Sequence, residues 1–434
     1  MMRWLTYSAV LILAGCSGKS LVEEREEALS AYQVPIYTHQ IPKFELNGFE
    51  QEYQKAASSQ YPEIAAVARQ RIADLALEES EKNLLQYNLD GSGSDQEAGY
   101  YKAIAIYTQL LREHPDRAMN DTVRYQLARA YDYAGEPLAK LDTLTELVTL
   151  HPQSLFYSEA QLRRGEQLFS LGRFSQAAEA YQAVTEKGES EPFYKHALYK
   201  HAWSVYRAGR YTAAYHTFAD VLDYLKVPAD MEQIKVGDQE LVKDVLRIMA
   251  ISFSQQQGAE SIKSFADSRN TPIYTPLFYQ VLAQQFATQR LYPQAAEVYL
   301  YFADNYITNP QAPVYHLEAI KMYGKGQMSE AQLASREAFV NRYGVDQSVW
   351  KQLPAELLAT VKPQIKENLL YLAKHHHALY QHGGDLLELD KAQGWYEALL
   401  VGFPNDPDSG ENHLLYAESL FEEKQYQQAA TAYQ

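Results

Sequence analysis

Two stretches with the same pattern decide how this chain folds: SEAQLRRGEQLFSLGRFSQAAEAYQAV at 158–184 and KHALYKHAWSVYRAGRYTAAYHTFADV at 195–221. Each holds two amphipathic helical patterns separated by a glycine, which predicts two helices joined by a turn at Gly172 or Gly209. When the turns are superposed, small and aromatic residues coincide at an offset of about 37 positions. The coinciding pairs are Gly165 with Ala202, Phe174 with Tyr211, Ala177 with Ala214, and Tyr181 with Phe218.

This pattern resembles the tetratricopeptide repeat (TPR), a helical hairpin of about 34 residues with small and aromatic residues at fixed positions. A small residue in each helix lets the two backbones approach closely, and the aromatic residues fill the space beside that contact. One hairpin cannot bury its own apolar face, so several must stack. The resemblance implies an all-α fold, an α-solenoid (superhelix) of stacked TPR hairpins.

The N-terminus, MMRWLTYSAVLILAGCSGKS, contains the only cysteine of the chain, Cys16. The apolar run Trp4–Leu13 after Arg3 is too short to span a bilayer stably, and fits a signal peptide. The end of this run, Leu13-Ala14-Gly15-Cys16, resembles a bacterial lipobox, which implies cleavage before Cys16 and lipidation of that cysteine. Ser17 at the next position implies export to the outer membrane, with the protein on its periplasmic face. The alternative is an ordinary secretory signal with a chance cysteine.

Together these patterns predict the organisation of the chain. The last hairpin reaches Tyr433, one residue before the chain stops, so we expect these residues to be the N-terminal part of a longer protein. The predicted ranges are 1–15 for a lipoprotein signal peptide, 16–60 for the lipidated cysteine and an extended tether, 61–225 for a first TPR block of about four repeats, 226–273 for an irregular helical segment, and 274–434 for a second block of about four repeats, the last one truncated.

The composition and motifs argue against several classes of function. Lys and Arg number 39 against 55 Asp and Glu, a net charge of −16, which disfavours binding to nucleic acid because phosphates need a basic surface. We find no catalytic motif and no phosphate-binding loop, and lipidation would consume the sole cysteine. The sequence therefore predicts no enzyme, no small-molecule substrate and no cofactor apart from the covalent lipid on Cys16.

The triplet His375-His376-His377 is the strongest metal candidate in the sequence. Neighbouring residues of a helix point about 100° apart, so three consecutive histidines cannot converge on one ion. The sequence therefore predicts no metal site. We expect His376 to fill an aromatic position of a repeat and its neighbours to be solvated.

The resemblance also implies a partner-binding groove, because in TPR domains certain positions of the first helix of each repeat line the concave surface. Aromatic and arginine side chains, which are enriched at interface hot spots, occupy many of these positions. The alternative is that several of them pack against neighbouring helices. The predicted groove residues are Tyr125, Arg129 and Tyr133, then Leu162, Glu166 and Phe169, and then Tyr199, Trp203, Tyr206 and Arg207.

These observations predict a non-enzymatic, lipid-anchored scaffold that binds other proteins of the bacterial cell envelope through this groove. A first alternative is an accessory domain of a longer envelope protein, whose catalytic or peptidoglycan-binding function lies beyond Gln434. A second alternative is a glycan binder, since tyrosine and tryptophan side chains stack on sugars.

Overall fold

The computed structural model of the chain describes residues 50–90, 97–344 and 354–433, and every regular element in these ranges is helical. The chain divides into two compact units, Met1–Tyr224 and Leu225–Gln434. The predicted signal peptide, the lipobox with Cys16 and residues 16–49 of the tether lie outside the described residues. The domain ranges given above stay a prediction.

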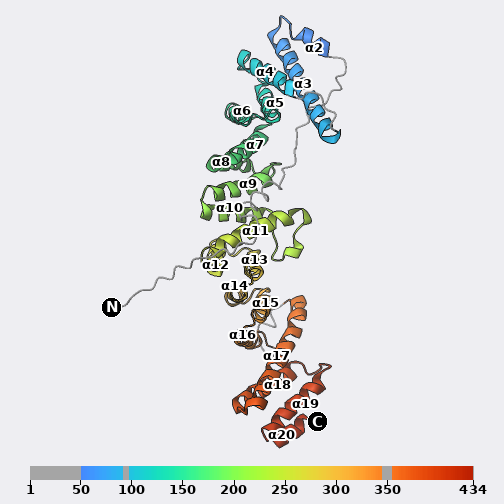
Figure 1. Cartoon of the computed structure of the whole chain (residues 1–434), viewed down its shortest axis with the longest axis vertical. Coiled ribbons are helices and arrows are strands. Elements are labelled where there is room, and N and C mark those ends of the chain that lie inside the picture. The colour runs from blue at the N-terminus through green and yellow to red at the C-terminus, as the bar shows by residue number, and fades with distance from the viewer. Residues whose placement is uncertain (1–49, 91–96, 345–353, 434) are drawn as a thin grey trace, which may run out of the picture. The chain divides into compact units, whose positions relative to one another are not determined.

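In the first unit, each helix packs against the next one along the chain (Figure 1). The pairs α3–α4, α5–α6, α7–α8 and α9–α10 are the hairpins, and α3 is the longest helix of this unit. The helices are α2 (Glu50–Ala56), α3 (Pro62–Asp90), α4 (Glu97–Glu113), α5 (Asn120–Tyr133), α6 (Pro137–Leu150), α7 (Tyr157–Ser170), α8 (Phe174–Thr185), α9 (Tyr194–Arg207) and α10 (Tyr211–Tyr224).

Glycine has two separate roles in these hairpins. Gly172 and Gly209, the predicted turn residues, have φ angles of 72° and 78°, in the left-handed region that other residues rarely adopt. Gly165 instead allows close packing, because a Cβ atom at this position would lie 2.7 Å from Cε1 of Tyr181 on the partner helix. The sequence pattern that predicted the repeat therefore reflects both backbone conformation and helix contact.

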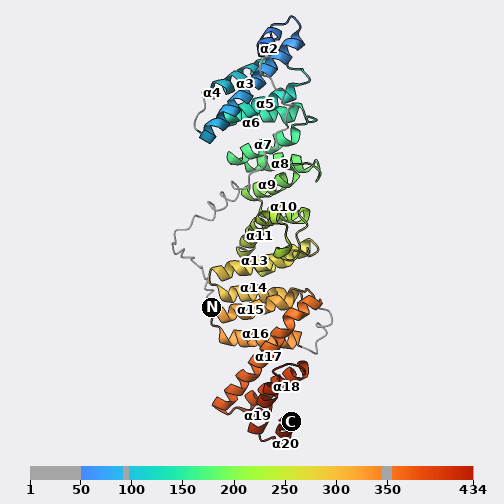
Figure 2. The ribbon, with the colours of Figure 1, turned by 90° about the vertical axis from the view of Figure 1, so that its right-hand side faces the viewer.

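In the second unit, α13 to α16 lie side by side in both views of the ribbon (Figures 1 and 2). Consecutive helices again pack in pairs. The elements are the 3-10 helices η1 (Met231–Gln233) and η2 (Val236–Asp238), then α11 (Gln239–Ser254), α12 (Ala259–Ser268), α13 (Thr275–Thr288), α14 (Tyr292–Asn305), α15 (Ala312–Lys325), α16 (Ser329–Tyr343), α17 (Ala355–Gly383), α18 (Leu386–Gly402), α19 (Ser409–Glu422) and α20 (Tyr426–Ala432).

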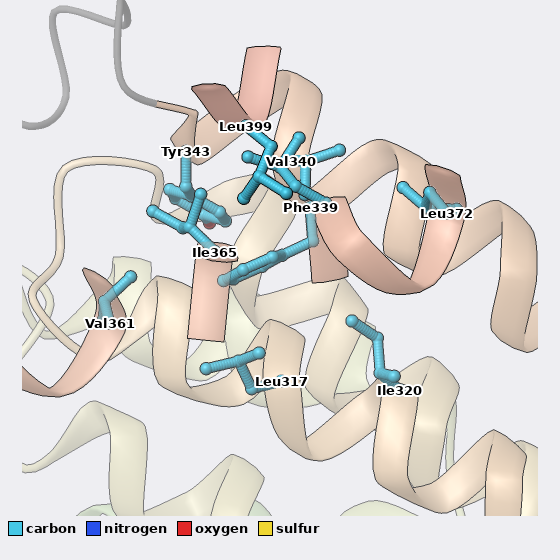
Figure 3. Close-up of a cluster of buried hydrophobic side chains, with 10 residues drawn as sticks. Leu317, Ile320, Phe339, Val340, Tyr343, Val361, Ile365, Leu372 and Leu399 are labelled. Atoms are coloured by element: carbon cyan, nitrogen blue, oxygen red, sulfur yellow. The ribbon is translucent and has the colours of Figure 1, made fainter. Parts of the chain in front are cut away.

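Buried apolar side chains between neighbouring helices hold the second unit together. Figure 3 shows one such cluster, in which Phe339 and Tyr343 of α16 lie among side chains of α15, α17 and α18. Both aromatic residues are fully buried. At about 25 cal/mol per Å² of buried apolar surface, contacts of this kind dominate the stability of a stacked hairpin.

The predicted fold class, an all-α solenoid of stacked helical hairpins, is confirmed for the part of the chain that the structure describes. The range 226–273, predicted as an irregular helical segment, contains the helices α11 (Gln239–Ser254) and α12 (Ala259–Ser268). Within the described ranges, no helix combines the length and the apolar character that crossing a membrane requires.

Candidate functional site

A pocket of about 220 Å³ lies between α5, α6 and α7 of the first unit. Three of the predicted groove residues line it, all of them from α5. The full set of lining residues is Tyr125, Ala128, Arg129, Asp132 and Tyr133 of α5, Lys140 and Leu144 of α6, and Glu159 and Arg163 of α7.

Helical spacing explains why α5 supplies so much of the pocket. Tyr125, Arg129 and Tyr133 are four residues apart and therefore share one face of the helix. The other face carries Val123 and Leu127, which are buried in a cluster with residues of α3 and α4. Since one face of α5 is bound to the preceding hairpin, the Tyr125–Tyr133 face is directed toward the pocket.

Ion pairs within the unit engage every cation of the pocket. Nη2 of Arg129 lies 2.5 Å from Oε1 of Glu81 on α3. Nζ of Lys140 lies 2.7 Å from Oδ1 of Asp132. Arg163 approaches two carboxylates of its own helix, Glu166 at 3.1 Å and Glu159 at 3.6 Å. A partner carboxylate would therefore have to compete with carboxylates already in place.

Tyr125 and Glu159 form the most buried polar part of the pocket. The Tyr125 ring stacks on Phe156 with 4.3 Å between centroids, and only 4% of the Glu159 side chain is exposed. Burial raises the pKa of the Tyr125 hydroxyl above its ordinary value, and the charge and hydrogen bond of Glu159 raise it further. Tyr125 therefore stays protonated and donates its hydrogen bond to the Glu159 carboxylate.

Tyr133 is the exposed aromatic residue of the pocket, with 42% of its surface accessible. Its ring stacks on that of Tyr100 with 5.4 Å between centroids and 11° between planes. Burial of the hydroxyl raises the pKa of Tyr133, and the nearby Glu81 carboxylate adds to the effect. The residue thus combines a fixed ring with solvent access, as an anchor for a partner requires.

Several predicted groove residues do not face solvent, and the prediction that they contact a partner directly is wrong for them. Leu162 and Trp203 are 0% exposed, Tyr199 is 2% exposed and Tyr206 is 8% exposed. The alternative holds for these residues, because they pack inside the stack. Tyr125 is also only 5% exposed, although it does line the pocket.

The packing of α9 shows why its aromatic residues are buried. The Trp203 ring meets Phe218 of α10 edge to face, with centroids 5.6 Å apart, and it meets Tyr206 at 5.8 Å. Tyr206 in turn packs on Tyr211 at 5.1 Å. These edge-to-face contacts are typical of an aromatic core.

The remaining predicted groove residues are half-buried. The Arg207 guanidinium lies over the ring of Phe174, 4.6 Å from its centroid, and 5.8 Å from that of Phe169. Glu166 pairs with Arg163. Arg207 and Phe169 therefore stabilise the contact between two repeats, and the structure does not bring them to the pocket.

Sequence reasoning missed five of the charged residues around the pocket, namely Asp132, Lys140, Glu159, Arg163 and Glu81. Asp132 and Glu159 occupy inner positions of their helices, so the register that selected Arg129 could also have selected them. Lys140 lies on the second helix of a hairpin, where that register does not apply. The partner of Arg129, Glu81, belongs to a different repeat, and no local pattern connects the two.

The histidine triplet also differs from expectation. His376 is buried as predicted, with its Nδ1 2.5 Å from Glu388 and its Nε2 3.2 Å from Glu337. His377, expected to be solvated, is 5% exposed, and its Nε2 lies 3.0 Å from Glu422. That expectation is wrong because α17 is covered on both sides by neighbouring helices. In the described ranges, no cluster of three or more His, Cys, Asp or Glu side chains has a metal-binding arrangement.

A family model matches one short part of the chain. Residues 159–187, which span α7 and α8, match the family model described as tetratricopeptide repeat. The chain therefore carries a tetratricopeptide repeat at the stretch that predicted the fold. A search of curated proteins found no match.

Solved structures with similar folds have low sequence identity. The crystal structure of MamA is 15% identical, covering 44% of this chain and 92% of that one, with a TM-score of 0.28. A tetratricopeptide repeat protein from Parabacteroides merdae is 13% identical, with coverages of 80% and 99% and a TM-score of 0.28. The structure of Naa15/Naa10 bound to HypK-THB is 12% identical, covering 89% of this chain and 62% of that one, with a TM-score of 0.34. Because each TM-score is below 0.5, these structural similarities support no conclusion about function.

Proposed function

We propose that this chain is a non-enzymatic scaffold that binds another protein of the cell envelope. A lipid on Cys16 would hold it at the periplasmic face of the outer membrane. The matched repeat at 159–187 and the stacked hairpins support the scaffold role. The Leu13–Cys16 motif supports the anchor.

The pocket between α5, α6 and α7 is the observation that carries the binding role. It is lined by the exposed Tyr133 and by Arg129 and Arg163. Tyrosine and arginine side chains are enriched at interface hot spots. The pocket's volume of about 220 Å³ is below the roughly 300 Å³ at which small-molecule sites begin. It therefore suits one side chain of a protein partner better than a free metabolite.

Site-specific photo-crosslinking in living cells tests the binding role. A photoreactive residue replaces Tyr133, and as a matched control it replaces Thr149, an exposed residue of α6 that does not line the pocket. We expect a discrete protein adduct from position 133 and none from position 149. An adduct from position 149 alone, or from neither position, would place the partner elsewhere and contradict the proposal.

Fractionation tests the anchor. We expect the Cys16→Ala protein to leave the membrane fraction and to lose incorporation of labelled fatty acid, because stable attachment needs more than one acyl chain or a second membrane signal. Wild-type protein expressed in parallel is the control. If the variant still sediments with membranes after a high-salt wash, the lipid anchor is wrong.

A further inference from the structure

One buried histidine of α17, His376, connects three helices of the second unit. It is 2% exposed. Its Nδ1 atom lies 2.5 Å from Oε2 of Glu388 on α18, and its Nε2 atom lies 3.2 Å from Oε1 of Glu337 on α16. An ionised carboxylate only accepts hydrogen bonds, and a neutral imidazole has a single N–H group. Both contacts are therefore hydrogen bonds only when the ring carries a proton on each nitrogen.

The charged groups around His376 favour this doubly protonated ring. Hydrogen bonds from Lys391 and His376 lower the pKa of Glu388, so this carboxyl group is ionised. The side chain of Glu337 is 37% exposed, so water solvates its charge. On α17 itself, partial burial and the charge of His376 lower the pKa of His375. The two carboxylates therefore face a proton held by His376 rather than by its neighbour.

His377, the next residue of α17, has a different environment. Its Nε2 atom lies 3.0 Å from Oε2 of Glu422 on α19, whereas its Nδ1 atom lies 3.4 Å from the hydroxyl of Tyr396 on α18. Burial, with the charges of Glu418 and Glu422, raises the pKa of Tyr396 to about 12, so its hydroxyl keeps a proton that it can donate. A neutral His377 ring can therefore donate to the carboxylate and accept from the hydroxyl, which satisfies both nitrogens.

We propose that His376 is a pH-sensitive link between α16, α17 and α18, in which the doubly protonated ring bridges Glu388 and Glu337 and the neutral ring releases Glu337. The contact with Glu388 is the shorter one, so the proton that remains stays on Nδ1. The lone pair on Nε2 then faces the Glu337 carboxylate and repels it. This inference concerns the second unit and does not depend on the proposed binding role.

The direction of the pH dependence follows from the protonated form being the one that bridges the helices. The hydrogen bond between α16 and α17 is present at mildly acidic pH, where imidazole is protonated. It is lost as the pH rises through the range in which imidazole titrates, around pH 6.5 for an unperturbed ring. The link between the two helices therefore weakens as the pH rises.

NMR of the full chain, labelled with ¹⁵N-histidine, tests the protonation states. Long-range ¹H–¹⁵N correlations report which ring nitrogens carry protons, and spectra of His376→Gln and His377→Gln assign the two rings. We expect His376 to carry a proton on both nitrogens at pH 5.5 and on Nδ1 alone at pH 8.5. The neutral His377 ring should carry its proton on Nε2.

Hydrogen exchange with mass spectrometry tests the effect on the helices. The protection factors of α16 amides, which correct for the pH dependence of intrinsic exchange, should be about three- to tenfold lower at pH 8.5 than at pH 5.5, as expected for the loss of one hydrogen bond. Glu337→Gln should remove this difference, because an amide can accept from the protonated ring and donate to the neutral one. The matched control, Glu422→Gln beside His377, should keep it.

Three results would overturn the inference: the same protonation state of His376 at both pH values, equal protection of α16 at both pH values, or a loss of the pH dependence in Glu422→Gln as large as that in Glu337→Gln. Thermal melting checks that each variant folds. If a histidine variant does not fold, hydrogen exchange of the wild type and of Glu337→Gln, whose replaced side chain is 37% exposed, decides.

Discussion

Helices α5 and α9 occupy equivalent places in two repeats, yet their inner faces have different roles. Arg129 of α5 and Trp203 of α9 share one register position. Arg129 is half-buried at the edge of a pocket, whereas Trp203 is 0% exposed. At a second shared position, Tyr133 is 42% exposed, whereas Arg207 lies over Phe174. The repeat register determines where a side chain points, and its neighbours determine whether a partner can reach it.

The neighbours of the two helices explain the difference. Around α9, the aromatic rings of Tyr199, Tyr206 and Phe218 pack edge to face on the indole of Trp203. Around α5, helix α3 of the preceding hairpin supplies the carboxylate of Glu81, which holds the Arg129 guanidinium by an ion pair. The Arg129 side chain, held in this way, is 26% exposed and lines the pocket.

The largest expected effect is a difference in stability between a variant of the buried Trp203 and a variant of the exposed Tyr133. Trp203→Ala should lower the free energy of unfolding by about 3–5 kcal/mol, because it removes a fully buried ring and leaves a cavity. Denaturant unfolding followed by circular dichroism measures it. Tyr133→Ala is the matched control and should cost about 1 kcal/mol or less. Equal losses in the two variants would contradict the contrast between the helices.

A second change tests the close helix contacts of the two repeats. Ala214→Trp should destabilise the α9–α10 hairpin by about 1–3 kcal/mol or more, because Ala214 is 0% exposed and a large side chain overpacks its site. Ala177→Trp should have a similar effect on α7–α8. Thermal melting measures both, with Ala213→Trp as control since Ala213 is exposed. Unchanged melting of both core variants would show that the packing register is wrong.

A third change acts on binding with little effect on stability. Tyr133→Ala should weaken binding of the partner captured at position 133 by about 0.5–1 kcal/mol, or roughly two- to fivefold, through loss of the exposed ring. Calorimetric titration of the purified partner measures it, and Tyr133→Phe should retain the affinity because the ring remains. A loss as large in Tyr133→Phe would show that the hydroxyl, not the ring, binds the partner.

A further effect depends on pH, since α9 carries histidines and α5 carries none. Burial, with the charges of Lys195 and Lys200, lowers the pKa of His196 from 6.5 to about 4, and the pKa of His201 is lowered mainly by burial. Between about pH 4 and pH 6.5, His196 binds a proton in the unfolded chain but not in the folded chain. The free energy of unfolding should therefore fall as the pH falls from about 6.5 toward 4. Above 6.5 this contribution is fully present.

Urea unfolding at pH 7.5 and pH 5 measures this pH dependence. We expect the double variant His196→Gln, His201→Gln to lose less stability between the two pH values than the wild type does. If the two proteins show the same difference, the histidines of α9 do not contribute.

The sequence alone predicted the helical hairpins, but it did not predict which residues line the pocket. Gly172 and Gly209 predicted the turns, since few residues other than glycine adopt their φ angles. In the second unit, Arg290, Gln327 and Lys424 follow the first helix of a hairpin with φ angles of 61°, 56° and 68°, so these turns lack the glycine signal.

The burial of the groove residues could not be predicted in the same way. Trp203 and Tyr133 looked equally suitable as anchors, because both are aromatic and lie at inner positions. Their difference depends on Phe218 in one case and on Tyr100 and Glu81 in the other. Such contacts join residues far apart in the chain, and a single sequence without its folded neighbours does not reveal them.

Hydroxyl-radical footprinting with mass spectrometry tests the central claim most directly, namely that α5 exposes its inner face and α9 buries it. In the free chain we predict rapid oxidation of Tyr133, which is 42% exposed, and protection of Trp203, which is 0% exposed although indole is the more reactive ring. Rapid oxidation of Trp203, or protection of Tyr133, in the free chain would contradict the account.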